Sequence, residues 1–553
     1  MSSYNMRSLK LPVLTGAGLK LFTALVENKF TRLFLIGSLL ENGGIPKLRQ
    51  ERFDEAPTFY PLIEPDTKLA VKFPTFSFTK KPKDFPYRTA SDYVKAYKDG
   101  SLTPLQAAEL VLTAVEASEK DEIPLRAFIL FDRNEILKQA KASTKRYKDN
   151  KPLGPLDGVP AAIKDEIDMK PYATNVGTRF IGVKPAAEDS TVAARLRDAG
   201  AILMGKTNIH EIGIAPNGCN ANFGAIRNPY NTDCDTGGSS SGSAAAVAAG
   251  LVPIAIGADG GGSIRIPASL CGVVGLKPTF ARVSEHGAAP LCWSVAHIGP
   301  LTSSVEDCAL AYSVIAGPDI SEPGTLKQSK VSIDGWNKGD LKGIKLGIFK
   351  EWFEHADPEV VKTCYQMVKQ FKKMGADVIK IDVPELDQMR IAHATTILSE
   401  MAICMRNYRE HQKEHGTSVR LSLILGQTFT AMDYVQAQRM RTRALAHFAK
   451  VFEKVDVIIT PGTAVAARPV PAGGYKIGWS DLGTDTELMR FVFPFNFTGH
   501  PAISFPVGYD SRGLPIGMQA VGRHWDEALL LRVAYNAESV VKRILPKRFY
   551  KVF

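Results

Sequence analysis

The segment 236–250 constrains this chain more than any other, because it joins consecutive glycines and serines directly to a run of small residues. It reads Thr-Gly-Gly-Ser-Ser-Ser-Gly-Ser-Ala-Ala-Ala-Val-Ala-Ala-Gly. Glycines allow backbone conformations that other residues avoid, and they let amide groups come close to a ligand. A flexible Gly/Ser linker is the simpler interpretation, but residues 244–249 are good helix formers. We therefore expect an ordered loop that continues into a helix.

A second glycine-rich segment follows at 259–265 and reads Asp-Gly-Gly-Gly-Ser-Ile-Arg. Its consecutive glycines present backbone N–H groups just before Ser263. Fixed donors of this kind suit an oxyanion hole, which stabilises the tetrahedral intermediate of acyl transfer. The two segments together predict a polar pocket lined by serine hydroxyls and amide protons.

Upstream, residues 156–168 predict a turn and then an apolar strand that delivers Lys164. A serine hydroxyl needs a base to remove its proton, and a neutral lysine can serve because burial disfavours the charged form. The carboxylates of Asp165 and Glu166 would oppose this by stabilising the ammonium. On a strand Asp165 would point to the opposite face, whereas Glu166 would stay near Lys164 unless the strand has ended. The sequence leaves this point open.

Competing motifs are weaker. Residues 238–242 match the GxSxG nucleophile elbow, but turn residues precede them where the elbow needs a strand. The sequence has no His/Cys/Asp cluster with metal spacing, so we expect neither a metal nor a cofactor. Three isolated histidines are expected to be structural: His210, His297 and His500.

The chain is long, but nothing marks a clean division after residue 88. The balance of 45% hydrophobic and 23% charged residues is ordinary for a soluble globular protein. Its seven cysteines form no CxxC pair, so we expect reduced thiols in an intracellular, non-secreted protein. Strand patterns alternate with helical ones, which predicts one α/β domain over 88–553. The expected strands are 201–205, 251–257, 345–349, 378–383, 455–461 and 501–507. The expected helices are 105–118, 132–149, 190–198, 358–375, 386–413 and 431–454, with Asp132 and Asp357 as N-caps.

Residues 1–45 are apolar but interrupted by four charged residues between 20 and 32. A spanning helix needs about 20 nearly uninterrupted apolar residues, and a secretory signal has no charges inside its apolar part. We predict two short amphipathic helices, with Thr15 as a possible N-cap and a break near Asn28. Their apolar faces can enter a bilayer surface, or they can pack on the protein's own core or on a partner subunit.

Residues 46–87 are rich in proline and predict an extended strap between the N-terminal helices and the body. Residues 1–88 hold 14 Lys/Arg against 8 Asp/Glu, within a net charge of +11 for the whole chain. No dense Lys/Arg run with interleaved aromatic residues is present, and no nucleic-acid motif. We therefore expect no nucleic-acid partner.

Three segments together resemble the amidase signature family. They are 158–165 (Gly-Val-Pro-Ala-Ala-Ile-Lys-Asp), 237–246 (Gly-Gly-Ser-Ser-Ser-Gly-Ser-Ala-Ala-Ala) and 259–267 (Asp-Gly-Gly-Gly-Ser-Ile-Arg-Ile-Pro). Later segments at 456–461, 500–504 and 513–517 agree, so the resemblance covers roughly residues 88–540. It implies a mixed twisted sheet covered by helices. It also implies a triad in which Ser263 resembles the nucleophile, Ser239 the bridging serine in a cis peptide linkage, and Lys164 the base.

The resemblance also implies an oxyanion hole. By position, Gly260, Gly261 and Gly262 resemble its donors, together with the amide of Ser263. One residue departs from the family pattern: Ser241 stands where many members have glycine.

Within the family, the chain is most similar to the plant-type fatty acid amide hydrolases. The similarity rests on 164–168 with Pro171, the Gly-Ser-Ser-Ser-Gly form of the serine segment, the triple glycine, and residues 14–22. It implies cleavage of N-acylethanolamines to a fatty acid and ethanolamine. It also implies a homodimer, bound peripherally to the endoplasmic reticulum or plasma membrane through residues 1–45, which shape the acyl channel.

Two other functions stay open. One is an amidase for small or polar amides such as indole-acetamide, or an amidotransferase component that works on charged tRNA; neither would use the apolar N-terminus. The other is a non-catalytic receptor or scaffold, which would have lost triad residues and gained repeats, whereas all three triad residues are present here.

Overall fold

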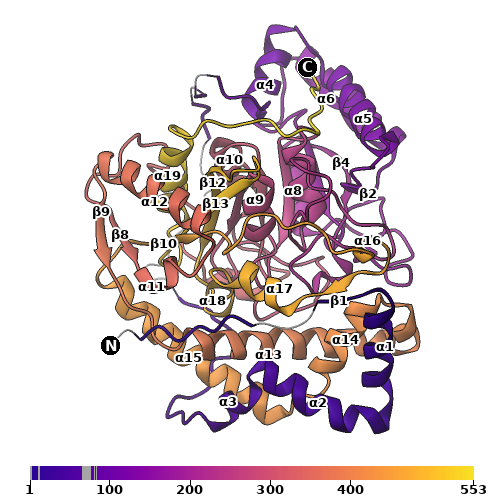
Figure 1. The fold of residues 1–553 in the computed structure, drawn as a ribbon. Helices are drawn as coiled ribbons and strands as arrows, with labels where there is room; N and C mark the ends of the chain where they lie inside the picture. Colours follow the sequence, from indigo (N-terminus) through magenta and orange to yellow (C-terminus); the bar gives the residue numbers. More distant parts are fainter. Residues whose placement is uncertain (1–2, 10–12, 65–75, 80, 83) are drawn as a thin grey trace.

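The computed structural model describes residues 3–9, 13–64, 76–79, 81–82 and 84–553. Its centre is one sheet, which has eleven strands in this described part (Figure 1). In order across the sheet they are β2 (Phe128–Leu130), β4 (Ile202–Thr207), β3 (Pro160–Lys164), β5 (Ile254–Ala258), β7 (Ile298–Thr302), β6 (Val274–Lys277), β12 (Ala502–Tyr509), β13 (Pro515–Gly522), β10 (Val457–Pro461), β8 (Lys345–Ile348) and β9 (Asp377–Lys380).

The sheet is mixed, as predicted. Strand β3 is parallel to β4 and β5, and β8 is parallel to β9 and β10. The strands between β5 and β10 pair antiparallel. The α/β fold class inferred from sequence is therefore confirmed.

Helices cover both faces of the sheet. The helices that follow residue 88 are α4 (Ala90–Asp99), α5 (Pro104–Lys120), α6 (Arg133–Lys148), α7 (Thr191–Asp198), α8 (Ser241–Ala248), α9 (Arg265–Cys271), α10 (Val305–Ile315), α11 (Lys350–Phe353), α12 (Pro358–Lys373), α13 (Leu386–Cys404), α14 (Thr417–Gly426), α15 (Ala431–Phe452), α16 (Gly474–Ile477), α17 (Leu482–Met489), α18 (Phe493–Phe497) and α19 (Glu527–Glu538). Short 3₁₀ turns are η1 (Glu211–Gly213), η2 (Pro323–Lys327) and η3 (Met405–Glu414).

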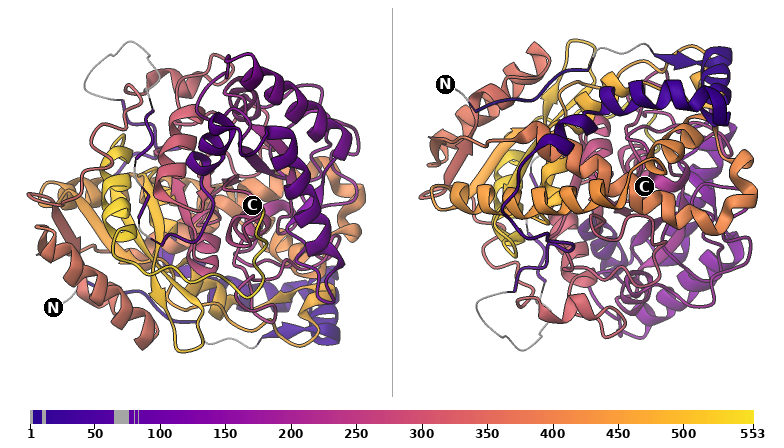
Figure 2. Two further views of the ribbon diagram at one scale, coloured as in Figure 1. Left: turned by 90° about the horizontal axis from the view of Figure 1, so that it is seen from above. Right: turned by 90° about the horizontal axis from the view of Figure 1, so that it is seen from below.

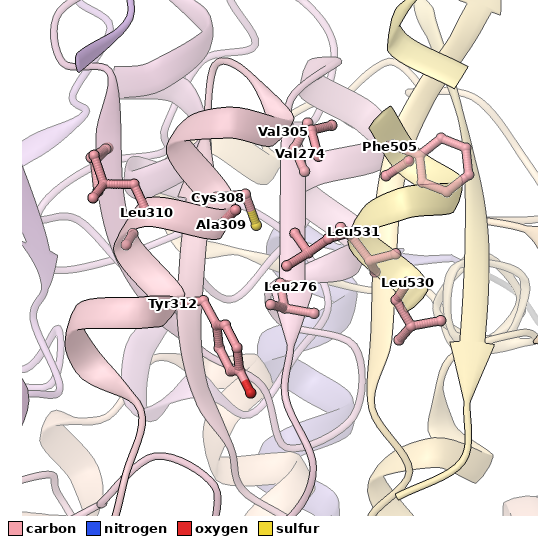
Figure 3. Close-up of a cluster of buried hydrophobic side chains, with 14 of the residues drawn as sticks. Val274, Leu276, Val305, Cys308, Ala309, Leu310, Tyr312, Phe505, Leu530 and Leu531 are labelled. Atoms are coloured by element: carbon pink, nitrogen blue, oxygen red, sulfur yellow. The ribbon is translucent and has the colours of Figure 1, made fainter. Parts of the chain in front are cut away.

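The two faces of the sheet bury separate cores. Along β3, Ala161 and Ile163 belong to one cluster and Ala162 to the other, because successive side chains of a strand point to opposite faces. On the first face α10 and α19 pack on the sheet (Figure 3), where Leu276 of β6 lies beside Tyr312 and Leu531. A strand buried on both sides gives a charged residue at its end little access to water.

The N-terminal helices pack against the helical layer formed by α13, α14 and α15, at the bottom of Figure 1 and facing the viewer in the right panel of Figure 2. They are α1 (Gly16–Glu27), α2 (Lys29–Gly43) and α3 (Ile45–Gln50), preceded by β1 (Leu14–Thr15), which pairs with β11 (Trp479–Ser480). Helix α1 buries Leu19 and Val26, so packing on the protein's own body, one of the alternatives that the sequence left open, is present. None of the helices in the described part combines the length and apolarity that crossing a bilayer requires.

Several local predictions need correction. The helix expected at 386–413 ends at Cys404 and continues as a 3₁₀ segment with a break at Tyr408. The break near Asn28 is present, and its side chain caps α2, but Thr15 and Asp357 make no side-chain cap bond. Part of the proline-rich strap, residues 65–75, 80 and 83, lies outside the described residues.

Candidate active site

Lys164 lies at the carboxyl end of β3, between β4 and β5, and its side chain is 1% exposed. Its Nζ donates to the hydroxyl of Ser239 at 2.9 Å and to the carbonyl of Ala258 at 3.1 Å. Ser239 is equally buried. The structure therefore brings the predicted base and the predicted bridging serine into direct contact.

The two carboxylates after Lys164 diverge. Asp165 turns away to Lys206, whose Nζ is 3.4 Å from its Oδ1, and it accepts the N–H of Gly177. Glu166 returns to the active-site side, and its Oε2 lies 2.6 Å from the Nζ of Lys164. Strand β3 has ended at Lys164, yet the turn that follows brings Glu166 back beside it. The question that the sequence left open is answered in favour of a lysine–carboxylate pair.

The serine segment forms an ordered loop that continues into α8, as predicted. The peptide bond between Gly238 and Ser239 is cis. The N–H of Ser240 donates to the carbonyl of Ser263 at 3.1 Å, so the two serine-bearing segments lie against each other. The hydroxyl of Ser241, the residue that departs from the family pattern, donates to the carbonyl of Gly237 at 2.6 Å.

Asp259 organises the glycine turn. Its carboxylate accepts the N–H groups of Gly262 at 2.6 Å and Ile264 at 3.0 Å, and it pairs with the buried guanidinium of Arg265. Burial alone would raise the pKa of this carboxyl, but the neighbouring charge of Arg265 holds its pKa well below its ordinary value. Asp259 therefore acts as an ionised anchor inside the protein.

The turn needs its glycines. Gly262 has φ +124°, a region that residues with a Cβ rarely adopt. A Cβ on Gly260 would lie 2.6 Å from the Sγ of Cys292. Because the Gly262 N–H already donates to Asp259, the amides without an intramolecular acceptor among the described residues of this turn are those of Gly260, Gly261 and Ser263.

A mainly apolar cavity leads away from Ser263. Around the glycine turn its wall includes His393 of α13 and Met489 of α17, and further along it includes Leu39 and Ile45 from the N-terminal segment. Other apolar residues of the wall include Leu9, Ile214, Ile397, Leu425, Phe429 and Phe493. The cavity thus joins the predicted nucleophile to helices that lie far from it in sequence.

The sequence interpretation missed two residues at the turn. The Nε2 of His393 lies 2.8 Å from the carbonyl oxygen of Gly260, and the Nδ2 of Asn496 donates to the carbonyl of Asp259 at 2.7 Å. Each comes more than 100 residues after the glycine segment, so no local motif could indicate it. His210, expected to be structural, lies beside the serine loop and lines the cavity, and burial lowers its pKa to about 4.

The sequence profile of the amidase family matches residues 109–531, well over half of the chain. This chain belongs to the amidase signature family. Full-length comparison agrees, because this amidase is 38% identical to a fatty acid amide hydrolase of Medicago truncatula over 97% of this chain and 94% of that relative. It is also 34% identical to a glutamyl-tRNA(Gln) amidotransferase subunit of Geobacter metallireducens over 80% of this chain and 94% of that relative.

Solved structures agree with the fold. The native peptide amidase of Stenotrophomonas maltophilia matches with a TM-score of 0.70 at 27% identity, over 84% of this chain and 99% of that one. The chain is therefore an amidase-family hydrolase. The family inferred from the three sequence segments is confirmed.

Proposed function

We propose that this amidase hydrolyses fatty acid amides, in particular N-acylethanolamines, to a free fatty acid and ethanolamine. The observation that carries the proposal is the apolar cavity that Ser263 shares with Leu39 and Ile45. Burial of an acyl chain contributes about 0.8 kcal/mol per CH₂, whereas a small polar amide gains nothing from such a wall. Similarity to plant fatty acid amide hydrolases over nearly the whole chain supports the same substrate class.

In the proposed reaction Ser263 is the nucleophile, Ser239 the bridge and Lys164 the base. Neutral Lys164 takes the proton of Ser239 while Ser239 takes that of Ser263, and the Ser263 oxygen attacks the amide carbonyl. The C–N bond then breaks as the proton returns along the same route to the leaving amine. Water attacks the acyl-enzyme, gives a proton to Ser263 through the same serine and lysine, and releases the fatty acid. The 2.9 Å contact of Lys164 with Ser239 supports this relay.

The turn at 259–263 suits the negative oxygen of the tetrahedral intermediate. Amides of Gly260, Gly261 and Ser263 have no acceptor among the described residues, so they are available to bind it. Gly262 fits this role less well because its N–H donates to Asp259. We therefore assign the proposed oxyanion hole to the amides of Gly260, Gly261 and Ser263.

Leu39→Trp tests the substrate class. We expect kcat/KM for a 16-carbon N-acylethanolamine to fall by at least tenfold, because the indole ring of the new tryptophan fills part of the cavity. Hydrolysis of a short soluble amide should change by less than threefold. Leu33→Trp is the matched control, since Leu33 lies on the same helix but is 75% exposed and outside the cavity wall. Equal losses on both substrates would contradict the acyl-binding role.

The same comparison of long-chain and short amides tests the alternative functions. An amidotransferase component is also a relative, and such an enzyme, like one for small amides, would prefer short or polar amides. If the unaltered protein hydrolyses short amides tenfold better than long-chain ones, the fatty acid proposal is wrong. The expected homodimer stays a prediction.

We also propose that α2 contacts a membrane surface. Phe30, Leu33 and Phe34 lie on one side of the helix at i, i+3 and i+4, and they are 79%, 75% and 85% exposed. The exposed Lys29 accompanies them and suits anionic headgroups. Truncating residues 1–45 would be a poor test, because α1 buries Leu19 and Val26 in the body and the same segment supplies Leu39 and Ile45 to the cavity wall.

The triple variant Phe30→Asp, Leu33→Asp and Phe34→Asp tests this surface. We expect cosedimentation with vesicles of phosphatidylcholine and phosphatidylserine to fall at least tenfold, while hydrolysis of a short soluble amide stays within twofold. The charge-matched control places three Asp at exposed positions elsewhere: Leu153, Val183 and Ile320. Wild-type sedimentation of the first variant, or equal loss in the control, would exclude α2 as the docking face.

A further inference from the structure

We propose that His393 and Asn496 are positioning residues that aim the oxyanion-binding amides through hydrogen bonds to the carbonyls of the glycine turn. Neither residue belongs to the segments that identify the family, and neither touches the reacting serine in the proposed mechanism. His393 comes from α13 and Asn496 from α18, and each bonds to one carbonyl of the turn. The inference rests on the proposed function of that turn.

The argument follows from the planarity of the peptide unit. In a trans peptide the C=O of one residue and the N–H of the next point in opposite directions. The bond from Asn496 to the carbonyl of Asp259 therefore fixes the direction of the Gly260 N–H. The bond from His393 to the carbonyl of Gly260 fixes, in the same way, the direction of the Gly261 N–H. These are two of the three amides that are available to bind an oxyanion.

Glycine makes such anchoring necessary. Three successive glycines have a wide choice of backbone conformations, and their own side chains cannot restrict them. Asp259 secures only the far side of the turn, through Gly262 and Ile264. Without an external bond, the peptide units that begin at Asp259 and Gly260 would be free to rotate between orientations.

The chemistry of His393 fits the assignment. A carbonyl oxygen can only accept, so we infer that its Nε2 carries the proton and donates. Burial lowers the pKa of His393 to about 4, which keeps the ring neutral near pH 7. A Cβ on Gly261 would lie 3.0 Å from the Cε1 of His393, so the ring packs directly on the turn and its position controls the backbone there.

The side chain of Asn496 is also held in place by hydrogen bonds. Its Nδ2 donates to the carbonyl and carboxylate of Asp259 at 2.7 and 2.8 Å, and its Oδ1 accepts from the guanidinium of Arg265 at 2.5 Å. The side chain is fully buried. Both of its polar atoms are therefore occupied in holding the turn.

The test compares His393→Leu, which removes the donor, with His393→Gln, which returns an N–H at comparable reach. For His393→Leu we expect kcat to fall by roughly 100-fold, in the range found for loss of one oxyanion donor, with KM within threefold. The inhibition constant of a trifluoromethyl ketone, whose adduct carries the oxyanion, should rise in parallel. His393→Gln should recover at least tenfold of the lost kcat.

His524→Leu is the matched control. His524 is half-buried, its Nε2 lies 2.9 Å from the carbonyl oxygen of Thr498, and desolvation lowers its pKa to about 4 as well. It does not contact the glycine turn, so its loss should leave the ketone affinity within threefold. If His524→Leu loses kcat and ketone affinity as His393→Leu does, then replacing a histidine away from the turn disturbs the site equally, and the proposal would be wrong.

A second readout separates this proposal from the substrate assignment. A fluorophosphonate places its phosphoryl oxygen where the carbonyl oxygen of a substrate would lie, so its rate of reaction with Ser263 needs no amide substrate. We expect His393→Leu to react at least tenfold more slowly and His393→Gln to recover. If His393→Leu reacts at the wild-type rate, or if the glutamine variant is as slow as the leucine variant, His393 does not aim the amides.

Discussion

Replacing Ser263 by alanine should lower kcat/KM for amide hydrolysis by about 10⁶-fold, to the limit of detection. The magnitude is that found when the nucleophile of a serine hydrolase is removed. The fold should survive, because no intramolecular hydrogen bond involves this hydroxyl in the part of the chain that the structure describes. Mass spectrometry after reaction with a fluorophosphonate should place the label on Ser263 in the wild type and nowhere in the variant.

Ser269→Ala is the matched control for this experiment. Ser269 lies on α9, is fully buried, and shares a 2.8 Å hydrogen bond with Ser504. Its loss should lower stability by about 1 kcal/mol and leave the label on Ser263. Labelling of any other serine in the wild type would overturn the assignment of the nucleophile.

The second large effect is expected at Lys164, where Lys164→Arg should lower kcat by about 10⁴-fold. Arginine carries a positive charge beside Glu166 and stays protonated at all relevant pH values, so it cannot accept the proton of Ser239. The fluorophosphonate reaction should slow by a similar factor. A variant with Lys164→Met and Glu166→Gln removes the pair as a whole and avoids a lone buried carboxylate; it should lose as much activity.

These two variants separate a proton acceptor from a structural cation. If Lys164→Arg stays within tenfold of the wild type, the charge of Lys164 matters and its proton exchange does not. Thermal unfolding of each variant shows whether the fold has survived. Loss of activity together with loss of the folded state would require a repeat under stabilising conditions before kcat is compared.

The parts of the site that could be predicted from sequence are those encoded within a few residues. Lys164 follows a short apolar run. Because this run forms a strand that is buried on both faces, the side chain of Lys164 is buried as well. The glycine turn and the serine loop each occupy one continuous segment. The alternation of short strands and helices is also a local pattern, and it predicted an α/β domain. The mixed sheet was predicted from the family resemblance.

What sequence could not predict depends on contacts between distant segments. His393 and Asn496 reach the turn only because α13 and α18 pack against it, and nothing near residue 260 indicates them. The position of Glu166 depended on how the chain turns after β3. The helix expected at 386–413 changes to 3₁₀ geometry after Cys404, and its apolar pattern gave no sign of the change.

The wall of the cavity has a consequence for when the enzyme becomes active. Leu39, Ser263, His393 and Met489 all border the same space, although they span most of the chain. Contacts of such long sequence separation form slowly. Because Met489 belongs to the wall, the complete binding space cannot exist before the chain has been synthesised beyond α17. A nascent chain or proteolytic fragment that ends before α17 would still contain the three segments that carry the proposed triad, yet it would lack part of the cavity wall.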